Sequence, residues 1–364
     1  MLKNEVRLIA FYLPQYHPIP ENDLWWGKGF TEWYNVVKAK PLFKGHYQPH
    51  IPADLGFYDL RLSEVREAQA DLAKEHGIYG FCYYHYWFNG KQLLERPFNE
   101  VLKSGKPDFP FCLCWANEDW MSKWDGREGN IIMGQSYSDN DDVDHIRWLI
   151  KAFSDPRYIR IDNKPLFLVY RASQLPDPKR TTSVWRNEAL KRGIGEIYLC
   201  RVESFSSERG DPRALGFDGA VEFQPDWKNL PSPLFSSRSW KMLSKLRLIS
   251  RNYSQHRVYL YSRLIDVMLK KAQVKYPFSH CVTPSWDNSP RRKEDAVILH
   301  ESTPSLYGYW LKETIERMTK EGNNIIFINA WNEWAEGNHL EPCQRWGTQY
   351  LEATRNAILS VDPS

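Results

Sequence analysis

Two carboxylates near the end of the chain have the spacing expected of an acid–base pair. Glu333 and Glu336 lie three residues apart in the segment 331–336, WNEWAE. On one helical turn such side chains share a face, about 5–6 Å apart at Cβ. Two like charges this close raise one pKa, so that one carboxyl stays protonated near neutrality. Glycosidic bond cleavage needs such a pair, one carboxyl to protonate the leaving oxygen and one to support charge at the anomeric carbon.

A structural role for the same two carboxylates is the alternative, because both could cap the last helix at its N-terminus. The indole rings of Trp331 and Trp334 interleave with them. Bulky rings seldom surround a plain helix cap, since Trp supplies a flat apolar face with one polar atom. The segment therefore favours chemistry over capping.

A rival carboxylate pair stands in the middle of the chain. Glu118 and Asp119 are also flanked by tryptophans, and Asn117-Glu118 resembles the Asn-Glu that ends a barrel strand in many glycosidases. The same dipeptide recurs as Asn332-Glu333. The dipeptide therefore does not choose between the two pairs, and both remain candidates.

The elements that must position these groups alternate between short β-rich runs and longer segments of helical period. An apolar run without alternation, such as 325–328 (IIFI), is typical of a parallel strand covered on both faces. We expect strands at 7–13, 79–86, 111–115, 166–170, 196–201, 219–223, 280–285 and 324–330. We expect helices at 59–76, 141–154, 182–192, 258–272, 305–320 and 348–360.

Eight strands with intervening helices predict an α/β fold, a single (β/α)₈ (TIM) barrel that spans residues 1–364 as one domain. A doubly wound open sheet is the alternative, but no Gly-x-Gly-x-x-Gly follows the first strand. Two long, aromatic-rich loop insertions, at about 14–58 and 202–257, are expected at the C-terminal face of the barrel. Long loops of this kind are usually functional.

The residues just past the strands predict a sugar-binding surface, because barrel enzymes place their active sites there. Aromatic, amide and carboxyl groups occur at nearly every predicted strand end, and 15% of the chain is aromatic. Sugars combine apolar C–H faces with hydroxyl edges, which suits Trp and Tyr. The predicted substrate-binding residues are Tyr16, His17, Trp26, Glu32, Tyr83, His85, Trp87, Trp115, Asn117, Glu118, Glu222, Trp286, Asn332 and Trp334.

Composition narrows the other classes of function. The net charge of +3 gives no footprint for nucleic acid, although a basic run at 238–275 keeps contact with an anionic membrane or glycan open. No segment reaches the ~18 apolar residues of a membrane span, and no apolar signal core follows Met1. Six cysteines without metal-like spacing are expected to be free thiols. We therefore expect a cytoplasmic monomer with a carbohydrate substrate, no metal and no cofactor.

Other catalytic motifs are missing from the sequence. The histidines form neither His-x-x-x-His nor His-Glu-x-x-His, and no Gly-x-Ser-x-Gly marks a serine nucleophile. A sugar-nucleotide transferase usually needs a phosphate cradle or an Asp-x-Asp metal site. The acidic run 139–142 (DNDD) offers the latter only at a helix start, where it is better interpreted as an N-cap.

Several motifs together resemble the WbsX-type proteins of bacterial polysaccharide gene clusters, from the first strand to the last helix. They are 10–17 (AFYLPQYH), 29–33 (GFTEW), 45–50 (GHYQPH), 54–59 (DLGFYD), 83–87 (YYHYW), 115–117 (WAN) and 331–336 (WNEWAE). That group is similar to the endo-α-mannosidase and endo-mannanase barrels of glycoside hydrolase family ninety-nine. Residues 202–275 match least.

The resemblance implies a metal-free, retaining hydrolase. In the hydrolase relatives one Glu deprotonates the sugar 2-hydroxyl, which attacks the anomeric carbon to give a 1,2-anhydro sugar, and a second Glu serves as acid and base. Glu333 would be the base on the 2-hydroxyl and Glu336 the acid/base. WbsX-type proteins are also named glycosyltransferases of O-antigen or capsule lipopolysaccharide synthesis, so transfer is the second hypothesis. A non-catalytic carbohydrate-binding barrel is the third, and two adjacent carboxylates argue against it.

Overall fold

Eight parallel strands close into a barrel in the computed structural model, which describes residues 6–121, 131–246 and 248–361. Each strand pairs with its two neighbours in the order β1-β14-β12-β10-β9-β8-β4-β2, and β2 pairs again with β1. The predicted (β/α)₈ barrel is therefore confirmed, with strand ends that differ by a few residues. The strands are β1 (Arg7–Tyr12), β2 (Ile78–Phe88), β4 (Phe111–Trp115), β8 (Lys164–Val169), β9 (Tyr198–Glu203), β10 (Gly219–Glu222), β12 (Phe278–Val282) and β14 (Ile325–Ile328).

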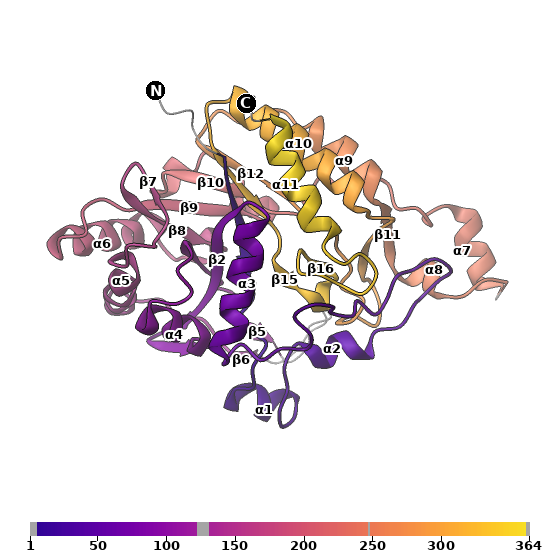
Figure 1. Cartoon of the computed structure of the whole chain (residues 1–364), viewed down its shortest axis with the longest axis horizontal. Coiled ribbons are helices and arrows are strands. Elements are labelled where there is room, and N and C mark those ends of the chain that lie inside the picture. The colour runs from indigo at the N-terminus through magenta and orange to yellow at the C-terminus, as the bar shows by residue number, and fades with distance from the viewer. Residues whose placement is uncertain (1–5, 122–130, 247, 362–364) are drawn as a thin grey trace.

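Helices cover most of the outer face of the barrel (Figure 1). They are α3 (Ser63–Glu75), α4 (Arg96–Ser104), α5 (Asp139–Phe153), α6 (Pro178–Lys191), α9 (Tyr261–Leu269), α10 (Pro304–Lys320) and α11 (Gln349–Val361). The acidic run at the start of α5 lies in its first turn, and the N-cap is Ser138, whose side chain accepts a hydrogen bond from the Asp141 amide. Between β9 and β10 the chain forms only the short 3₁₀ helices η2 (Ser206–Glu208) and η3 (Pro212–Leu215).

The helix predicted at 258–272 is wrong in its first part. Residues Arg257–Leu260 form strand β11, which pairs in parallel with β13 (Val297–His300) beside the barrel. The β-branched and aromatic residues Val258 and Tyr259 favour a strand, and the tertiary pairing overrides the helical period that continues from α9. This small second sheet holds the 283–296 segment close to the barrel mouth.

The first insertion and several short elements lie at one end of the barrel, the lower edge in Figure 1, and the second insertion extends to the right in that view. The first insertion contains α1 (Pro20–Trp26) and α2 (Trp33–Lys38), and the second contains α7 (Arg238–Lys245) and α8 (Asn252–Gln255). With them lie the hairpins β5–β6 (Trp120–Met121, Ile131–Met133) and β15–β16 (Asn332–Glu333, Asn338–His339). This is the end at which the barrel strands terminate.

Two sequence-based expectations about the chain as a whole can be compared with the structure. All six cysteines are free and buried. Within the described ranges, no helix is both long and apolar enough to cross a membrane.

Candidate active site

A cavity of about 630 Å³ opens at the carboxyl ends of the strands. Both candidate carboxylate pairs line it, Glu333 with Glu336 and Glu118 with Asp119. Aromatic side chains form a large share of its lining, which agrees with the expected chemistry of a sugar-binding surface. The aromatic lining residues are Trp26, Tyr84, Tyr86, Trp120, Tyr170, Phe205, Phe223, Trp227 and Trp286.

Glu333 and Glu336 do not share an α-helical turn, contrary to the geometry predicted from their spacing. Glu333 ends the short strand β15, and Glu336 ends the 3₁₀ turn η4 (Trp334–Glu336). The side chain of Asn332 holds this segment against β1, because it accepts from the Leu13 amide (2.7 Å) and donates to the Leu13 carbonyl (3.1 Å). The two carboxyl groups nevertheless meet at a common partner.

That partner is Arg291, which the sequence analysis did not identify. Its guanidinium lies 2.8 Å from Glu336 Oε1, 3.0 Å from Glu32 Oε2 and 3.5 Å from Glu333 Oε2. Burial opposes its charge, yet the three carboxylates raise the pKa of Arg291 well above its usual range. One positive charge therefore faces three acidic groups in a nearly closed space.

The pKa values of the two glutamates follow from this imbalance. Burial is the largest cause and raises the pKa of Glu333 to about 8; Arg291 lowers it, and Glu336 and Glu32 raise it again. Burial also raises the pKa of Glu336 against the opposing effect of Arg291. Both carboxyl groups therefore hold a proton more tightly than an exposed glutamate does, and they titrate as a pair. A protonated and an ionised carboxyl side by side is the condition for general acid–base catalysis.

The motif at 45–50 holds the segment that carries Arg291. His46 Nε2 lies 2.7 Å from Asp287 Oδ2, and Gln48 Nε2 donates to the same oxygen at 2.6 Å. The Asp287 amide in turn donates to the Glu336 carbonyl at 2.6 Å. Gly337, at φ 55°, lets the two backbones approach, because a Cβ there would lie 3.0 Å from the Asp287 Cβ. The first insertion thus positions Glu336 through Asp287.

Several predicted substrate-binding residues lie behind the carboxylates and outside the cavity lining. The Tyr16 hydroxyl donates to the Asn332 carbonyl (2.7 Å) and accepts from the Trp334 amide (3.1 Å). The Trp334 ring is buried, stacks on His339 at 3.7 Å and donates to Glu341. Glu32 is fully buried and reaches the cavity only through Arg291. These contacts fix the reactive segment.

Strand β2 presents to the cavity the side chains that alternate with those predicted to line it. Tyr84 and Tyr86 line the cavity, whereas Tyr83, His85 and Trp87 point outward to the helices. His85 contacts His145 of α5 at 3.0 Å, and burial lowers its pKa to about 3. Successive side chains of a strand alternate between faces, so a shift of one residue reverses the whole set.

The other predicted residues divide in the same way. Trp26, Glu118 and Trp286 line the cavity. Trp115 is in the core and donates to the Trp87 carbonyl, and Asn117 bonds the backbone of Arg171. His17 is buried beside the Pro14 carbonyl and does not line the cavity. Among the tryptophans predicted to bind substrate, Trp26 and Trp286 are lining residues, whereas Trp87, Trp115 and Trp334 are not.

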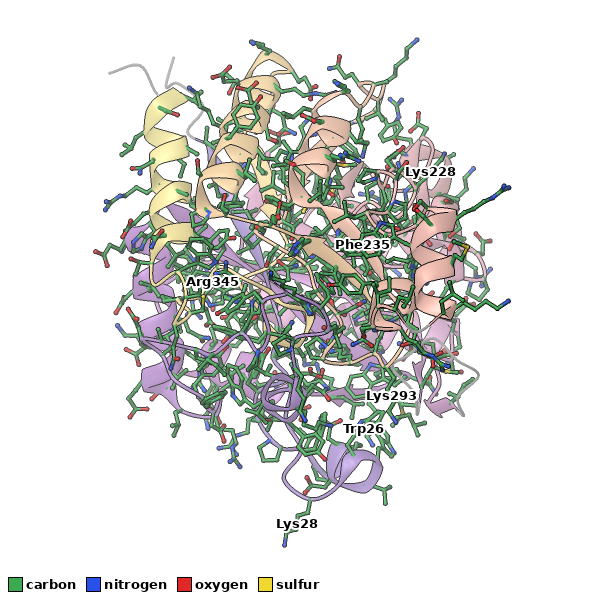
Figure 2. All side chains as sticks on the ribbon, turned by 90° about the vertical axis from the view of Figure 1, so that its right-hand side faces the viewer. Trp26, Lys28, Lys228, Phe235, Lys293 and Arg345 are labelled. Carbon is green, nitrogen blue, oxygen red and sulfur yellow. The ribbon has the colours of Figure 1, made fainter. Side chains whose placement is uncertain are left out.

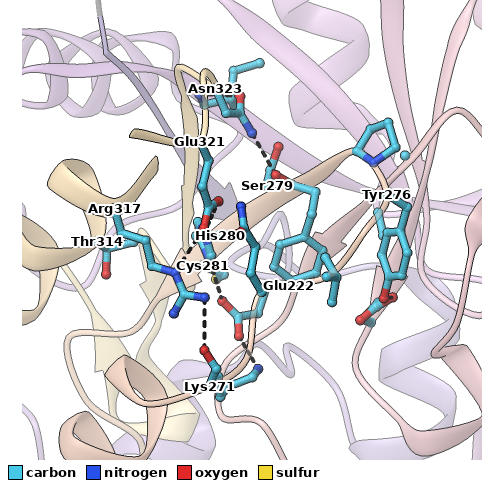
Figure 3. Close-up of a pocket in the computed structure, with 18 of the residues that line it drawn as sticks. Glu222, Lys271, Tyr276, Ser279, His280, Cys281, Thr314, Arg317, Glu321 and Asn323 are labelled. Carbon is cyan, nitrogen blue, oxygen red and sulfur yellow. Dashed lines mark hydrogen bonds and ion pairs between the residues drawn. The ribbon is translucent and has the colours of Figure 1, made fainter. Parts of the chain in front are cut away.

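Glu222 lies in a different place, a cavity of about 570 Å³ on the outer face of the barrel (Figure 3). Its neighbours on the chain, Val221 and Phe223, face the barrel interior, so Glu222 points outward. It is paired with Lys271 and accepts from the Cys281 amide (3.1 Å). Burial raises its pKa, but Lys271 and His280 outweigh burial and hold the pKa of Glu222 at about 2.

No set of three or more His, Cys, Asp or Glu side chains is placed to hold a metal ion in the part of the chain that the structure describes. The carboxylate oxygens of Glu32 and Glu336, which could act as metal ligands, instead contact Arg291. The groups available for chemistry at this site are therefore carboxyl groups next to aromatic side chains.

Comparison with known families gives a match along almost the whole chain. Residues 8–354 match the model of the family described as glycosyltransferase WbsX. Two proteins called WxcX, from two strains of Xanthomonas campestris pv. campestris, are 45% identical to it over 354 residues, 96% of this chain. The chain spans about half the length of these curated relatives, 49% of each.

Solved structures show the same fold at low sequence identity. A GH99 endo-α-mannosidase from Bacteroides thetaiotaomicron, in complex with bis-tris-propane, has a TM-score of 0.59 and 15% identity, with 97% of both chains covered. A glycoside hydrolase-like protein has a TM-score of 0.57 and 13% identity, with 98% of this chain and 95% of the other covered. At these identities the likeness establishes the barrel fold.

Proposed function

The chain belongs to the WbsX glycosyltransferase family of carbohydrate-active enzymes, and from this premise we propose that it is a retaining glycoside hydrolase that reacts through Glu333 and Glu336. One observation carries the proposal. Two buried carboxyl groups share a single guanidinium, and burial raises the pKa of both, at the wall of a cavity with aromatic lining residues. Sugar-nucleotide transfer by itself calls for no such pair.

The reaction we propose passes through a 1,2-anhydro sugar. Glu333 takes the proton of the 2-hydroxyl, the freed oxygen attacks the anomeric carbon, and Glu336 protonates the departing glycosidic oxygen. In the second step Glu336 deprotonates a water that opens the three-membered ring, and Glu333 returns its proton to the 2-oxygen. The net configuration is retained, and both carboxyl groups end as they began.

Arg291 supports these two reaction steps without forming or breaking a covalent bond. It lies against both carboxyl groups and Glu32, so it limits the repulsion when the proton moves from one glutamate to the substrate. Trp26, Tyr84, Tyr86 and Trp286 are proposed to contact the sugar faces. Tyr16, Asn332 and Trp334 are proposed as positioning residues.

Transfer is the second candidate, and the name of the matching family favours it. Transfer from a glycan donor differs from hydrolysis only in the acceptor of the second step, which would be a sugar hydroxyl in place of water. A sugar-nucleotide donor would require a different first step, with a diphosphate as the leaving group.

The test is incubation with bacterial surface polysaccharides, with and without sugar nucleotides, followed by measurement of new reducing ends. We expect wild-type protein to release reducing ends without a nucleotide, and the Glu333→Gln/Glu336→Gln double variant to release none. Glu118→Gln is the matched control, because Glu118 lines the same cavity but is paired with Arg171 at 2.5 Å. Product that forms only with a sugar nucleotide would establish transfer, and activity that survives in the double variant would refute the assignment to this pair.

A further inference from the structure

Three arginines line one side of the active-site cavity. Arg257 begins β11, and Arg291 and Arg292 lie in the segment between β12 and β13, which β11 holds in place through its pairing with β13. All three border the cavity that also contains Glu333 and Glu336. Figure 2 labels Lys293, the next residue, in the lower part of the molecule, as it does Trp26.

The three arginines differ in what they already bind. Arg291 is committed to three carboxylates. Among the residues that the structure describes, no carboxylate lies within ion-pair distance of Arg257 or Arg292. The Arg257 guanidinium contacts only the Asp295 carbonyl, at 3.4 Å, and Arg292 is fixed through its backbone amide to the Ser289 carbonyl at 3.2 Å. Two guanidinium groups thus remain available to a ligand.

The carboxylates described on the opposite side of the cavity have partners of their own. Glu118 is bound to Arg171 at 2.5 Å, and Asp119 accepts the Gln135 amide at 2.6 Å. A neutral sugar gives no reason to keep two unpaired arginines beside an acid–base pair. Arg292 even opposes the acid, since its charge favours the ionised form of Glu336. A negatively charged substituent on the substrate would cancel that effect as it binds.

We propose that Arg257 and Arg292 form a subsite for an oxyanion carried by a sugar next to the cleaved bond. This inference rests on the proposed function and names its substrate class, an acidic glycan. A guanidinium offers paired N–H donors that match a carboxylate or a phosphate. The shared chemistry has two sources, the carboxylate of a uronic acid or the phosphate of a phosphorylated or nucleotide-linked sugar.

The test measures binding of acidic oligosaccharides against their neutral counterparts. The probes are oligomers of galacturonate, mannuronate and glucuronate, each paired with the same oligomer after reduction of its carboxyl groups, and inorganic phosphate and UDP as the phosphate arms. Wild-type protein should bind at least one acidic probe about tenfold more tightly than its neutral or phosphate-free counterpart (galactose, mannose or glucose oligomers, or uridine). The Arg257→Gln/Arg292→Gln variant should lose that preference.

The matched control is Arg263→Gln, which removes an exposed arginine of the same basic region on α9, outside the cavity. It should keep the preference, whereas general attraction to polyanions would weaken in this variant as well. The preference in wild type should also fall as salt rises. Tighter binding of a uronate probe identifies a uronic acid as the source, and tighter binding of UDP or phosphate identifies a phosphate.

The outcomes separate this inference from the proposed function. If no acidic probe is preferred, or the double arginine variant keeps the preference, the subsite is refuted even where Glu336→Gln abolishes reducing-end release. If the arginine-dependent preference is found but no polysaccharide is cleaved, the subsite stands and hydrolysis is refuted. A melting temperature of the double arginine variant close to wild type would exclude unfolding as the cause of lost binding.

Discussion

The barrel has two cavities of similar size, about 630 Å³ at the mouth and about 570 Å³ on the outer face, and each encloses a buried glutamate with a cationic partner. Their electrostatics are opposite. On the outer face Glu222 is paired with Lys271 and contacted by His280, and its pKa is about 2. At the mouth Glu333 shares Arg291 with two other carboxylates, and its pKa is about 8.

Burial alone therefore does not make a carboxyl group reactive, because both glutamates are buried. The ratio of cations to carboxylates around a buried carboxyl group decides whether that group is ionised or keeps a proton. A carboxylate with its own ammonium group is locked in the ionised form and contributes to stability, whereas carboxylates that compete for one guanidinium keep a proton to exchange. The outer cluster is thus expected to hold the fold together and the inner one to perform chemistry.

The largest effect should come from Glu336→Gln. Loss of the general acid should reduce kcat/KM on a natural glycan by about 10³-fold, roughly 4 kcal/mol of transition-state stabilisation. The melting temperature should stay or rise, since the change removes one of three buried carboxyl groups that compete for Arg291. Steady-state kinetics and thermal melting measure both quantities. An equal loss on aryl glycosides with good leaving groups would contradict the acid role, because such groups need little protonation.

The reverse pattern is expected for Glu222→Gln. This change leaves the buried ammonium group of Lys271 with Asp226 as its remaining carboxylate partner, at 2.6 Å. It should lower the free energy of unfolding by about 2–3 kcal/mol and leave kcat/KM unchanged. Chemical denaturation and kinetics on one preparation measure both. A drop in activity without a drop in stability would remove the distinction between the two cavities.

The two glutamates should also give opposite dependences of stability on pH. Glu333 loses its proton near pH 4.5 when unfolded and near 8 when folded, so stability falls as pH rises between these values, by at most about 1.4 kcal/mol per pH unit. Glu222, whose folded pKa is about 2, gives stability that is present above pH 4.5 and lost as pH falls towards 2. Melting curves of Glu333→Gln should lack the first slope and those of Glu222→Gln the second.

The smallest effect concerns the aromatic walls. Trp26→Ala should weaken glycan binding by about 1 kcal/mol, roughly fivefold, because its partly exposed ring lines the inner cavity. Tyr276→Ala, which removes a ring from the outer cavity, should leave binding unchanged. Titration calorimetry with an active polysaccharide distinguishes them. Equal binding by both variants would mean that the inner aromatic wall does not contact the sugar.

The fold could be predicted almost completely from sequence, because parallel strands buried on both faces leave apolar runs that local pattern detects. The strand predicted at 111–115 matches β4 with its full bounds, and the strand predicted at 324–330 contains β14 with a few extra residues at its ends. The region 258–272 failed at its start, since the pairing of β11 with β13 is a contact between residues about forty positions apart. Residue pattern within one segment contains no information about such a partner.

The candidate site could be predicted in kind but not in detail. Glu333 and Glu336 were selected because both lie in one short motif with tryptophans, and both line the cavity. Arg291 was missed because it follows an ordinary Ser-Pro turn, and its meaning arises only when three distant segments meet. On β2 and β10 the side chains were assigned to the site without determining which face of the strand each one occupies. Tyr83 was therefore predicted in place of Tyr84, and Glu222 was predicted at the barrel mouth although it points outward. The motif at 45–50 could have indicated a positioning role, because its His46 and Gln48 side chains bind Asp287.

The bond between Leu13 and Asn332 joins residues 319 positions apart, and β1 and β14 pair across nearly the same distance. During synthesis the first strand must therefore wait for almost the entire barrel before it gains its second neighbour, and residues emerge from the ribosome at about 5–20 per second. The segment with Glu333 and Glu336 arrives immediately after β14, so the same event closes the sheet and assembles the reactive pair. Nascent chains consequently lack the assembled pair of Glu333 and Glu336, which forms only with the completed barrel.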